Sequence, residues 1–187
     1  TKIGAVLVFD EVSSGLRMNT GGVHLTYNVN PDIAVFAKAL SNGYPMAAVV
    51  GVADVMEAAQ STFISSTSWT EAIGPAAALA TLKKHRRLEV GAHLVEMGQR
   101  VQAEWQVAAD RAGLEIHVEG LAPMSHLRFG YDNGLELETL YTQLMLEKGI
   151  LASGMYWPSL AHTSQHHDQF FEAMDQAFQV CGQAVQA

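Results

Sequence analysis

Cysteine is almost absent from this chain, since Cys181 is the only one among 187 residues. A single thiol excludes a disulfide framework within the chain and suits a reducing compartment, so we expect the cytoplasm. Basic residues are also few: eleven lysines and arginines stand against nineteen acidic residues, a formal net charge of −8 at pH 7. This balance argues against nucleic acid as a partner.

Long apolar runs are missing too. None approaches the roughly 20 residues that span a bilayer, and residues 1–4 lead into a predicted strand without a signal-peptide pattern, so we expect no membrane partner. The opening lacks an initiator Met, which suggests a piece of a longer protein. The densest basic cluster, residues 83–87, lies where a helix is predicted to end. Cations stabilise that end of a helix, so we assign the cluster no function.

Apolar residues make up 49% of the chain, as in an ordinary globular protein with a buried core. Continuous apolar runs at 5–9, 33–37 and 46–52 predict strands of an α/β fold, and we expect the first to be buried on both faces. A helix is predicted over 55–60, with Asp54 as its N-cap.

Helical patterns dominate from residue 72 onward. An Ala-rich helix is predicted over 72–82, and a long amphipathic helix over 90–112 that ends at Gly113. Short strands then alternate with helices, the strands at 114–118, 124–129 and 150–152 and the helices at 136–148 and 164–185.

This pattern predicts three parts. Residues 1–88 form a portion of an α/β domain, residues 89–113 a connecting helix, and residues 114–187 a small α+β domain.

Asp10 and Lys38 follow two neighbouring predicted strands. Parallel α/β sheets bind ligands at the carboxyl ends of their strands, and the spacing can bring both residues to one such edge. A carboxylate and an amine that converge there are either a functional pair or a plain buried ion pair. Spacing alone leaves both alternatives open.

Several motifs surround these two residues. Residues 9–17 read FDEVSSGLR, residues 21–22 are Gly-Gly, residues 31–33 read PDI, and residues 37–45 read AKALSNGYP. In order and spacing they resemble the class III aminotransferases, and the Leu16-Arg17 ending resembles the glutamate-1-semialdehyde aminomutase branch. The resemblance covers most of residues 4–82. It implies the C-terminal portion of a fold-type I pyridoxal-phosphate-dependent transferase: part of the large-domain sheet plus a small α+β C-terminal domain.

The resemblance implies a role for each matching residue. Lys38 would form a Schiff base with pyridoxal 5'-phosphate and then shuttle a proton between substrate and cofactor. Asp10 would face the pyridine nitrogen and keep it protonated. Val12 would pack on one face of the ring, or be an ordinary core valine. Thr67, in a hydroxyl-rich loop, matches a threonine that binds the phosphate of the neighbouring subunit, which implies a homodimer with shared active sites.

Four residues are candidate substrate contacts. Arg17 suits a substrate carboxylate because a guanidinium binds that group with two hydrogen bonds, although a structural ion pair explains it as well. Glu71 belongs to a loop that departs from the small-residue pattern of the family. Tyr156 and Trp157 either line the substrate pocket or pack in the core.

Three histidines, His162, His166 and His167, have a spacing that also occurs in metal sites. Thr163 or Ser164 is, however, a natural N-cap, and aminomutase-like proteins have a similar start to their last helix. We therefore predict no metal.

The predicted activity is transfer of an amino group between small amino and keto compounds, or within one molecule as in an aminomutase. Members of this family are much longer, and the half that carries the phosphate loop and a ring-stacking aromatic is not in this sequence. The alternative is a truncated, catalytically silent fragment that acts only as a dimerising remnant. We also expect exposed apolar sheet surface, and a chain that alone assembles with a partner chain or binds the cofactor weakly.

Overall fold

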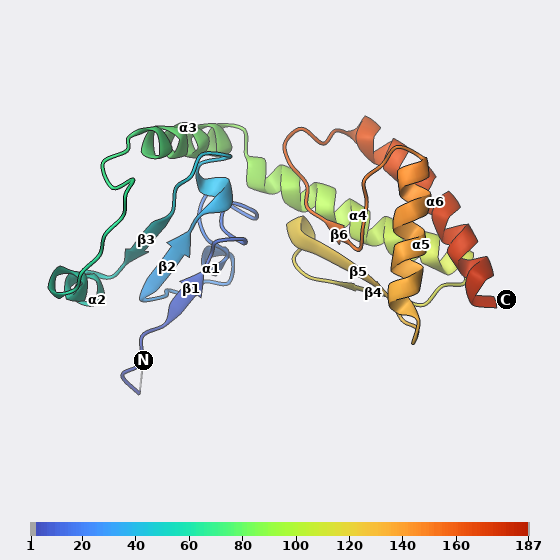
Figure 1. Cartoon of the computed structure of the whole chain (residues 1–187), viewed down its shortest axis with the longest axis horizontal. Helices are drawn as coiled ribbons and strands as arrows, with labels where there is room; N and C mark the ends of the chain where they lie inside the picture. Colours follow the sequence, from blue (N-terminus) through green and yellow to red (C-terminus); the bar gives the residue numbers. More distant parts are fainter. Residues whose placement is uncertain (1–2, 187) are drawn as a thin grey trace. The chain divides into compact units, whose positions relative to one another are not determined.

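The computed structural model describes residues 3–186 and divides the chain after Ala92 into two compact units. Each unit has a sheet and helices of its own (Figure 1). Among the described residues, no helix combines the length and apolar character needed to cross a bilayer.

The first unit is built on a three-stranded sheet. β1 (Val8–Asp10) pairs in parallel with β2 (Ile33–Phe36), and β3 (Ala48–Gly51) runs antiparallel to β2. Asp10 lies opposite Val35, so the carboxyl ends of β1 and β2 meet at one edge of the sheet. All three predicted strands of this unit are therefore present, each shorter than its apolar run.

Helical segments complete the first unit: α1 (Val23–Thr26), η1 (Lys38–Leu40), α2 (Ala53–Met56), η2 (Glu57–Ser61) and α3 (Ile73–Arg87). The prediction that Asp54 caps α2 is wrong. The helix begins directly after β3 with Val52 as its N-cap, and Asp54 lies in the first turn. α3 continues past its predicted end, and residues 84–87 of the basic cluster occupy its last turn, as expected from the helix dipole.

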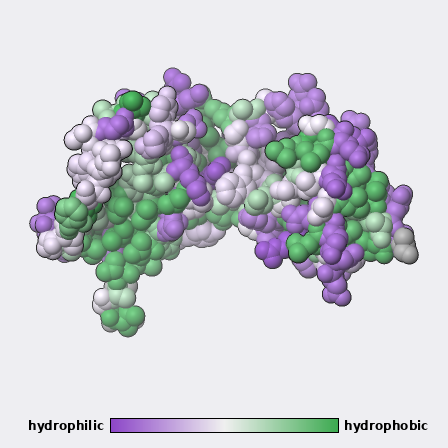
Figure 2. Space-filling view, viewed as in Figure 1, coloured by the Kyte–Doolittle hydropathy of each residue, from purple (hydrophilic) through white to green (hydrophobic). Residues whose placement is uncertain are grey.

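The sheet of the first unit exposes apolar surface. The prediction that β1 is buried on both faces is wrong, because Val8 is 53% exposed and Val6 is 51% exposed. Val49 and Val50 of β3 are exposed to a similar extent, and Figure 2 shows hydrophobic colour over this unit. No other layer of the described residues covers these side chains, so the expected exposed apolar surface is confirmed.

The second unit joins an antiparallel sheet to three helices. Its elements are α4 (Val90–Ala112), β4 (Ile116–Glu119), η3 (Ala122–Met124), β5 (Ser125–Phe129), α5 (Gly134–Glu147), β6 (Met155–Tyr156) and α6 (Ser164–Gln186), with strand order β4-β5-β6. The first three residues of α4 belong to the first unit. α4 has its predicted bounds, and Gly113 follows it with φ +66°.

The prediction of a strand at 150–152 is wrong. The Ile150 amide donates to the Met145 carbonyl at 3.0 Å and closes the end of α5. A backbone group used in that way cannot join a sheet. The third strand is β6 instead, where Tyr156 pairs with Ser125.

Aromatic side chains fill the core of the second unit. Trp105, Tyr141 and Phe178 have no exposed surface. The ring centroids of Tyr141 and Phe178 lie 5.5 Å apart at an interplanar angle of 62°, an edge-to-face arrangement that aromatic quadrupoles favour. Trp105 comes from α4, so the helix that was expected to be a connector contributes to this core.

Substitution of Gly98 tests how α4 packs. A Cβ there would lie 1.8 Å from the Ala122 carbonyl oxygen. Alanine gains about 1 kcal/mol of helix propensity over glycine, but overpacking costs about 1–3 kcal/mol. Because the neighbour is backbone, we expect Gly98→Ala to lose about 1–2 kcal/mol of unfolding free energy. Urea titration, monitored by circular dichroism, measures this change in the free energy of unfolding.

The matched control is Gln99→Ala, at an exposed neighbouring position on the same helix. It should stay within about 0.5 kcal/mol of the parent chain. A Gly98→Ala variant as stable as this control would contradict the described packing of α4.

Candidate active site

Asp10 and Lys38 lie at the same edge of the first unit's sheet. Asp10 ends β1, and Lys38 begins η1 shortly after β2. Both residues are exposed. The Asp10 Oδ1 accepts from the Val12 amide at 3.0 Å, whereas the Lys38 Nζ donates to the Ser13 hydroxyl. The alternative of a plain buried ion pair therefore does not hold, because neither residue is buried and the two have different partners.

The backbone of Lys38 is strained. Its φ is +46°, in the left-handed region that residues with a Cβ rarely adopt. Such a conformation costs of order 1–3 kcal/mol and persists only where surrounding structure enforces it. Ala37 before it is extended, with φ −156° and ψ −150°, so the chain turns sharply between β2 and η1. Strain of this kind is concentrated at functional sites.

Glu11 is a buried group that the sequence analysis missed. It is 1% exposed, and its carboxylate accepts hydrogen bonds from the Ser14 hydroxyl at 2.5 Å and the Val23 amide at 2.9 Å. It also accepts from the amide and the ring Nδ1 of His24, at 3.1 and 2.8 Å. Burial raises the pKa of Glu11, but these hydrogen bonds together lower it by more, so its pKa lies below the usual value.

These bonds place Glu11 at the start of α1. Val23 and His24 open that helix, and its N-cap residue, Gly22, has no side chain to accept from them. The Glu11 carboxylate satisfies these donors from outside the helix. Side-chain alternation continued one residue past β1 could have indicated this, because adjacent residues of an extended chain face opposite ways.

Arg17 and Lys38 line one open hollow of about 650 Å³; its other lining residues are Ala39, Asn42, Gly43, Tyr44, Pro45 and Met46. Burial lowers the pKa of the Arg17 guanidinium, which still carries its charge at neutral pH. Two cations on one hollow suit an anionic group of a small molecule.

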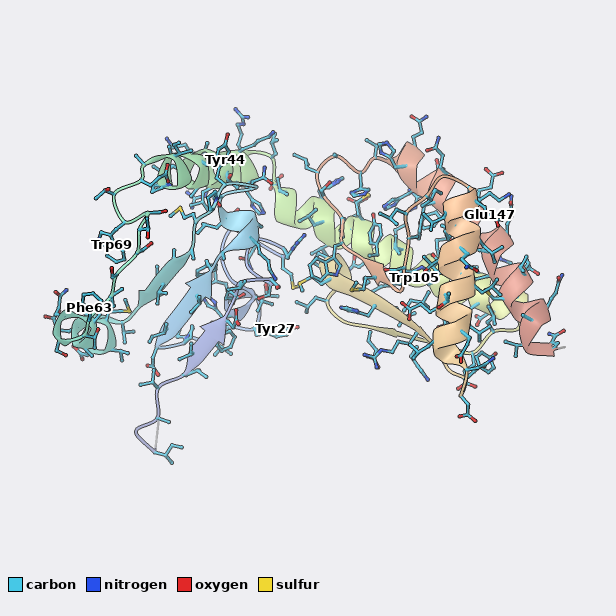
Figure 3. The ribbon with its side chains drawn as sticks, in the orientation of Figure 1. Tyr27, Tyr44, Phe63, Trp69, Trp105 and Glu147 are labelled. Carbon is cyan, nitrogen blue, oxygen red and sulfur yellow. The ribbon has the colours of Figure 1, made fainter. Side chains whose placement is uncertain are left out.

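Val12 is partly buried, and Thr67 lies on an exposed turn that does not line this hollow. Two large side chains of the same loop region, Phe63 and Trp69, are 95% and 68% exposed (Figure 3). The structure therefore does not bring Thr67 together with Lys38 within the first unit.

Glu71, a candidate substrate contact, caps a helix. Its Oε1 accepts from the Ile73 amide at 2.6 Å, and its Oε2 accepts from the Gly74 amide at 3.0 Å. These are two of the unpaired amides at the start of α3. The carboxylate therefore has a structural function in this loop.

Tyr156 and Trp157 line a second hollow, of about 640 Å³, within the second unit; its walls include Ile150, Leu151, Met155, His162, His166, His167 and Phe170. The Tyr156 hydroxyl lies 2.5 Å from His167 Nε2. Burial raises the pKa of Tyr156 to about 12, so the phenol keeps its proton at neutral pH. Its ring centroid lies 6.0 Å from that of Phe170. The walls of this hollow combine aromatic rings with aliphatic side chains.

The three histidines of this region have hydrogen-bond partners. His162 Nδ1 accepts from the Ser159 amide at 2.9 Å, and His166 Nδ1 accepts from the Thr163 amide at 3.1 Å. Within residues 3–186, no group of histidine, cysteine and acidic side chains is arranged to hold a metal ion.

Comparison with known proteins gives consistent matches. A family model described as aminotransferase class-III matches residues 1–178. Aminopentol aminotransferase of Sphingopyxis macrogoltabida is 29% identical and aligns with 94% of this chain and 42% of its own length. Glutamate-1-semialdehyde 2,1-aminomutase of Desulforudis audaxviator is 30% identical, with 94% and 44% covered.

A solved structure has the same fold. The FumI protein of Sphingopyxis sp. MTA144, in its PLP internal aldimine form, superimposes with a TM-score of 0.91 and 27% identity. The match covers 100% of this chain and 45% of that one. This chain therefore spans less than half the length of the relatives that it resembles.

Replacing Glu11 tests its function as a buried acceptor. Glutamine has one acceptor oxygen and an NH2 group that cannot accept, so some of the donors around Glu11 lose their partner. We expect Glu11→Gln to destabilise the first unit by about 1–3 kcal/mol. Amide hydrogen exchange at Val23 and His24 should accelerate accordingly. Glu57→Gln, at an exposed position, is the control, and equal exchange in both variants would rule out this function.

The second unit should lose stability in mild acid because of His167. Burial, followed by the charge of Arg100, lowers the pKa of His167 from 6.5 to about 4. Between these values the unfolded chain binds more protons than the folded one, so stability falls as pH drops from about 6.5 to about 4. The full effect is about 3 kcal/mol, at about 1.4 kcal/mol for each pKa unit.

Urea titrations at pH 7 and pH 4.5 measure this loss. His167→Gln removes the titrating group and should flatten the pH dependence, whereas His166→Gln, at an exposed neighbouring position, should retain it. The same pH dependence in both variants would show that another group is responsible.

Proposed function

This chain belongs to the class III aminotransferase family, and we propose that it is the C-terminal part of an enzyme that transfers an amino group with pyridoxal 5'-phosphate as its cofactor. The observation that carries the proposal is the position of Lys38. It lies on a strained turn at the carboxyl edge of two parallel strands, next to the end of β1 where Asp10 is exposed. A reactive amine and a carboxylate at one sheet edge suit a cofactor that needs both.

The residues present fit this cofactor. Lys38 is exposed and lines an open hollow with a second cation, Arg17, and Asp10 has a carboxylate oxygen beyond the one that accepts from Val12. When bound, pyridoxal phosphate supplies an aldehyde that reacts with amines and a ring that accepts electrons from the substrate carbon.

Each residue then has a defined function. With the cofactor bound, the Lys38 amine would hold it covalently and, once released, would move a proton between two carbon atoms. The Asp10 carboxylate would accept a hydrogen bond from the protonated ring nitrogen and stabilise its charge. Val12 would pack on the ring. Arg17 binds a carboxylate of the substrate.

The substrates are small amino and keto compounds, and an aminomutase performs the same steps within one molecule. Thr67 is proposed to bind the cofactor phosphate of the neighbouring subunit in a homodimer, which agrees with its place outside the Lys38 hollow. Tyr156 and Trp157 are proposed to contact substrate through the hollow that they line in the second unit. The single, buried thiol of Cys181 supports a cytoplasmic location.

A second candidate is a catalytically silent fragment that acts only through self-association. The exposed valines of β1 and β3 favour it, because a sheet surface of this kind usually packs against another layer. The two candidates differ in whether Lys38 reacts with the cofactor.

Cofactor trapping tests the proposal. The chain is incubated with pyridoxal phosphate, reduced with borohydride, digested and mapped by mass spectrometry. We expect the adduct on Lys38 and its loss in Lys38→Arg, with no loss in Lys148→Arg, which replaces an exposed lysine of the second unit.

An adduct at other lysines with none on Lys38 would contradict the assignment of the site. An adduct on Lys38 in a longer parent protein, but none in this chain, would identify this chain as silent by itself.

A further inference from the structure

The Lys38 amine has a defined position although its side chain is exposed. Within residues 3–186, its described hydrogen bond is the one that its Nζ donates to the Ser13 hydroxyl. An exposed lysine otherwise samples many rotamers, and ordering it costs about 1.5–2 kcal/mol of side-chain entropy. A fixed acceptor beside the amine offsets part of this cost.

Ser13 is itself held in place by its neighbours. The Arg17 Nε donates to the Ser13 carbonyl at 3.3 Å, and the Gly15 amide donates to the Glu11 carbonyl at 2.8 Å. The Ser14 hydroxyl bonds to the buried Glu11 carboxylate. The turn over residues 11–15 is therefore anchored on both sides of Ser13.

The same turn is packed against the strand that leads to Lys38. A Cβ at Gly15 would lie 2.6 Å from the Glu11 carbonyl oxygen and 2.7 Å from the Phe36 ring. Only a glycine lets the turn come so close to Phe36, which ends β2 shortly before Lys38. Ser13 and Lys38 are thus carried by two segments in direct contact.

A hydroxyl is chemically suited to hold this amine. It accepts a hydrogen bond from an ammonium and from a neutral amine alike, and it adds no charge. A carboxylate in its place would favour the ammonium, which has no lone pair for reaction with an aldehyde. The nearby carboxylate of Asp10 bonds instead to the Val12 amide.

We propose that Ser13 is a positioning residue that holds the Lys38 amine where it reacts with the aldehyde of the cofactor. The inference rests on the proposed function, and it adds a residue to that site. Ser13 acts through Lys38 rather than on the substrate.

The first measurement is the mobility of the Lys38 ammonium, from NMR order parameters of lysine side-chain nitrogen in the parent chain. We expect a higher order parameter for Lys38 than for Lys148, which is exposed and lies outside this site. Ser13→Ala should lower the Lys38 value to that of Lys148, and Ser13→Thr, which keeps a hydroxyl, should restore it. Ser61→Ala is the matched control, because the exposed Ser61 of the first unit donates its hydroxyl to the Ala58 carbonyl and not to Lys38.

The second measurement is trapping of pyridoxal phosphate with borohydride, read as the ratio of Lys38 adduct to Lys148 adduct. Loss of one hydrogen bond to the amine should lower this ratio about threefold to tenfold in Ser13→Ala. Ser13→Thr should restore the parent ratio, and Ser61→Ala should change it by less than about twofold. A merely structural function of Ser13 would lower stability without moving the ratio.

The outcomes separate the two proposals. A Lys38 that is equally mobile in the parent chain and in Ser13→Ala, or an unchanged adduct ratio, overturns the function of Ser13 and leaves the proposed function standing. A parent chain with a restrained Lys38 but no adduct there contradicts the proposed function, and the inference fails with it.

Discussion

The Glu11 carboxylate is buried at the end of β1, where four donor groups from Ser14, Val23 and His24 surround it. A buried charge costs several kcal/mol unless hydrogen bonds satisfy it, so these donors cannot separate from it without a penalty. The carboxylate thereby ties the end of β1, the following turn and the start of α1 into one piece. Because Glu11 faces inward, Asp10 faces outward at the sheet edge.

The strain at Lys38 is accommodated by ordinary packing nearby. Leu40, two residues later, is buried with Leu16 and Ala78 in the small core of the first unit, and its amide donates to the Ala37 carbonyl at 3.0 Å. These contacts favour η1 in a geometry that Lys38 alone would not adopt. The amine is therefore presented by a rigid turn rather than by a flexible loop.

Much of this arrangement could be predicted from the sequence. Prediction succeeds where a hydrophobic pattern is long or where a residue such as glycine marks its end. The bounds of α4 follow from a helical period sustained to Gly113, and the meeting of Asp10 and Lys38 follows from parallel pairing of two apolar runs. β6 could not be predicted, because its two residues pair only where β5 offers an edge. The exposure of β1 could not be predicted either, because an apolar run does not reveal whether another layer covers the strand. Glu11 and Glu71 were missed as caps because the helix donors that they accept from are backbone amides, which nearly every residue carries.

The distribution of aromatic side chains has a practical consequence. Trp105 is fully buried and Trp157 is 40% exposed, both in the second unit, whereas the first unit has only Trp69, which is 68% exposed. The emission wavelength of an indole shifts when the indole leaves an apolar core, whereas that of an indole already exposed to water hardly changes. Intrinsic fluorescence of this protein therefore reports unfolding of the core of the second unit and responds little to unfolding of the unit that carries Lys38.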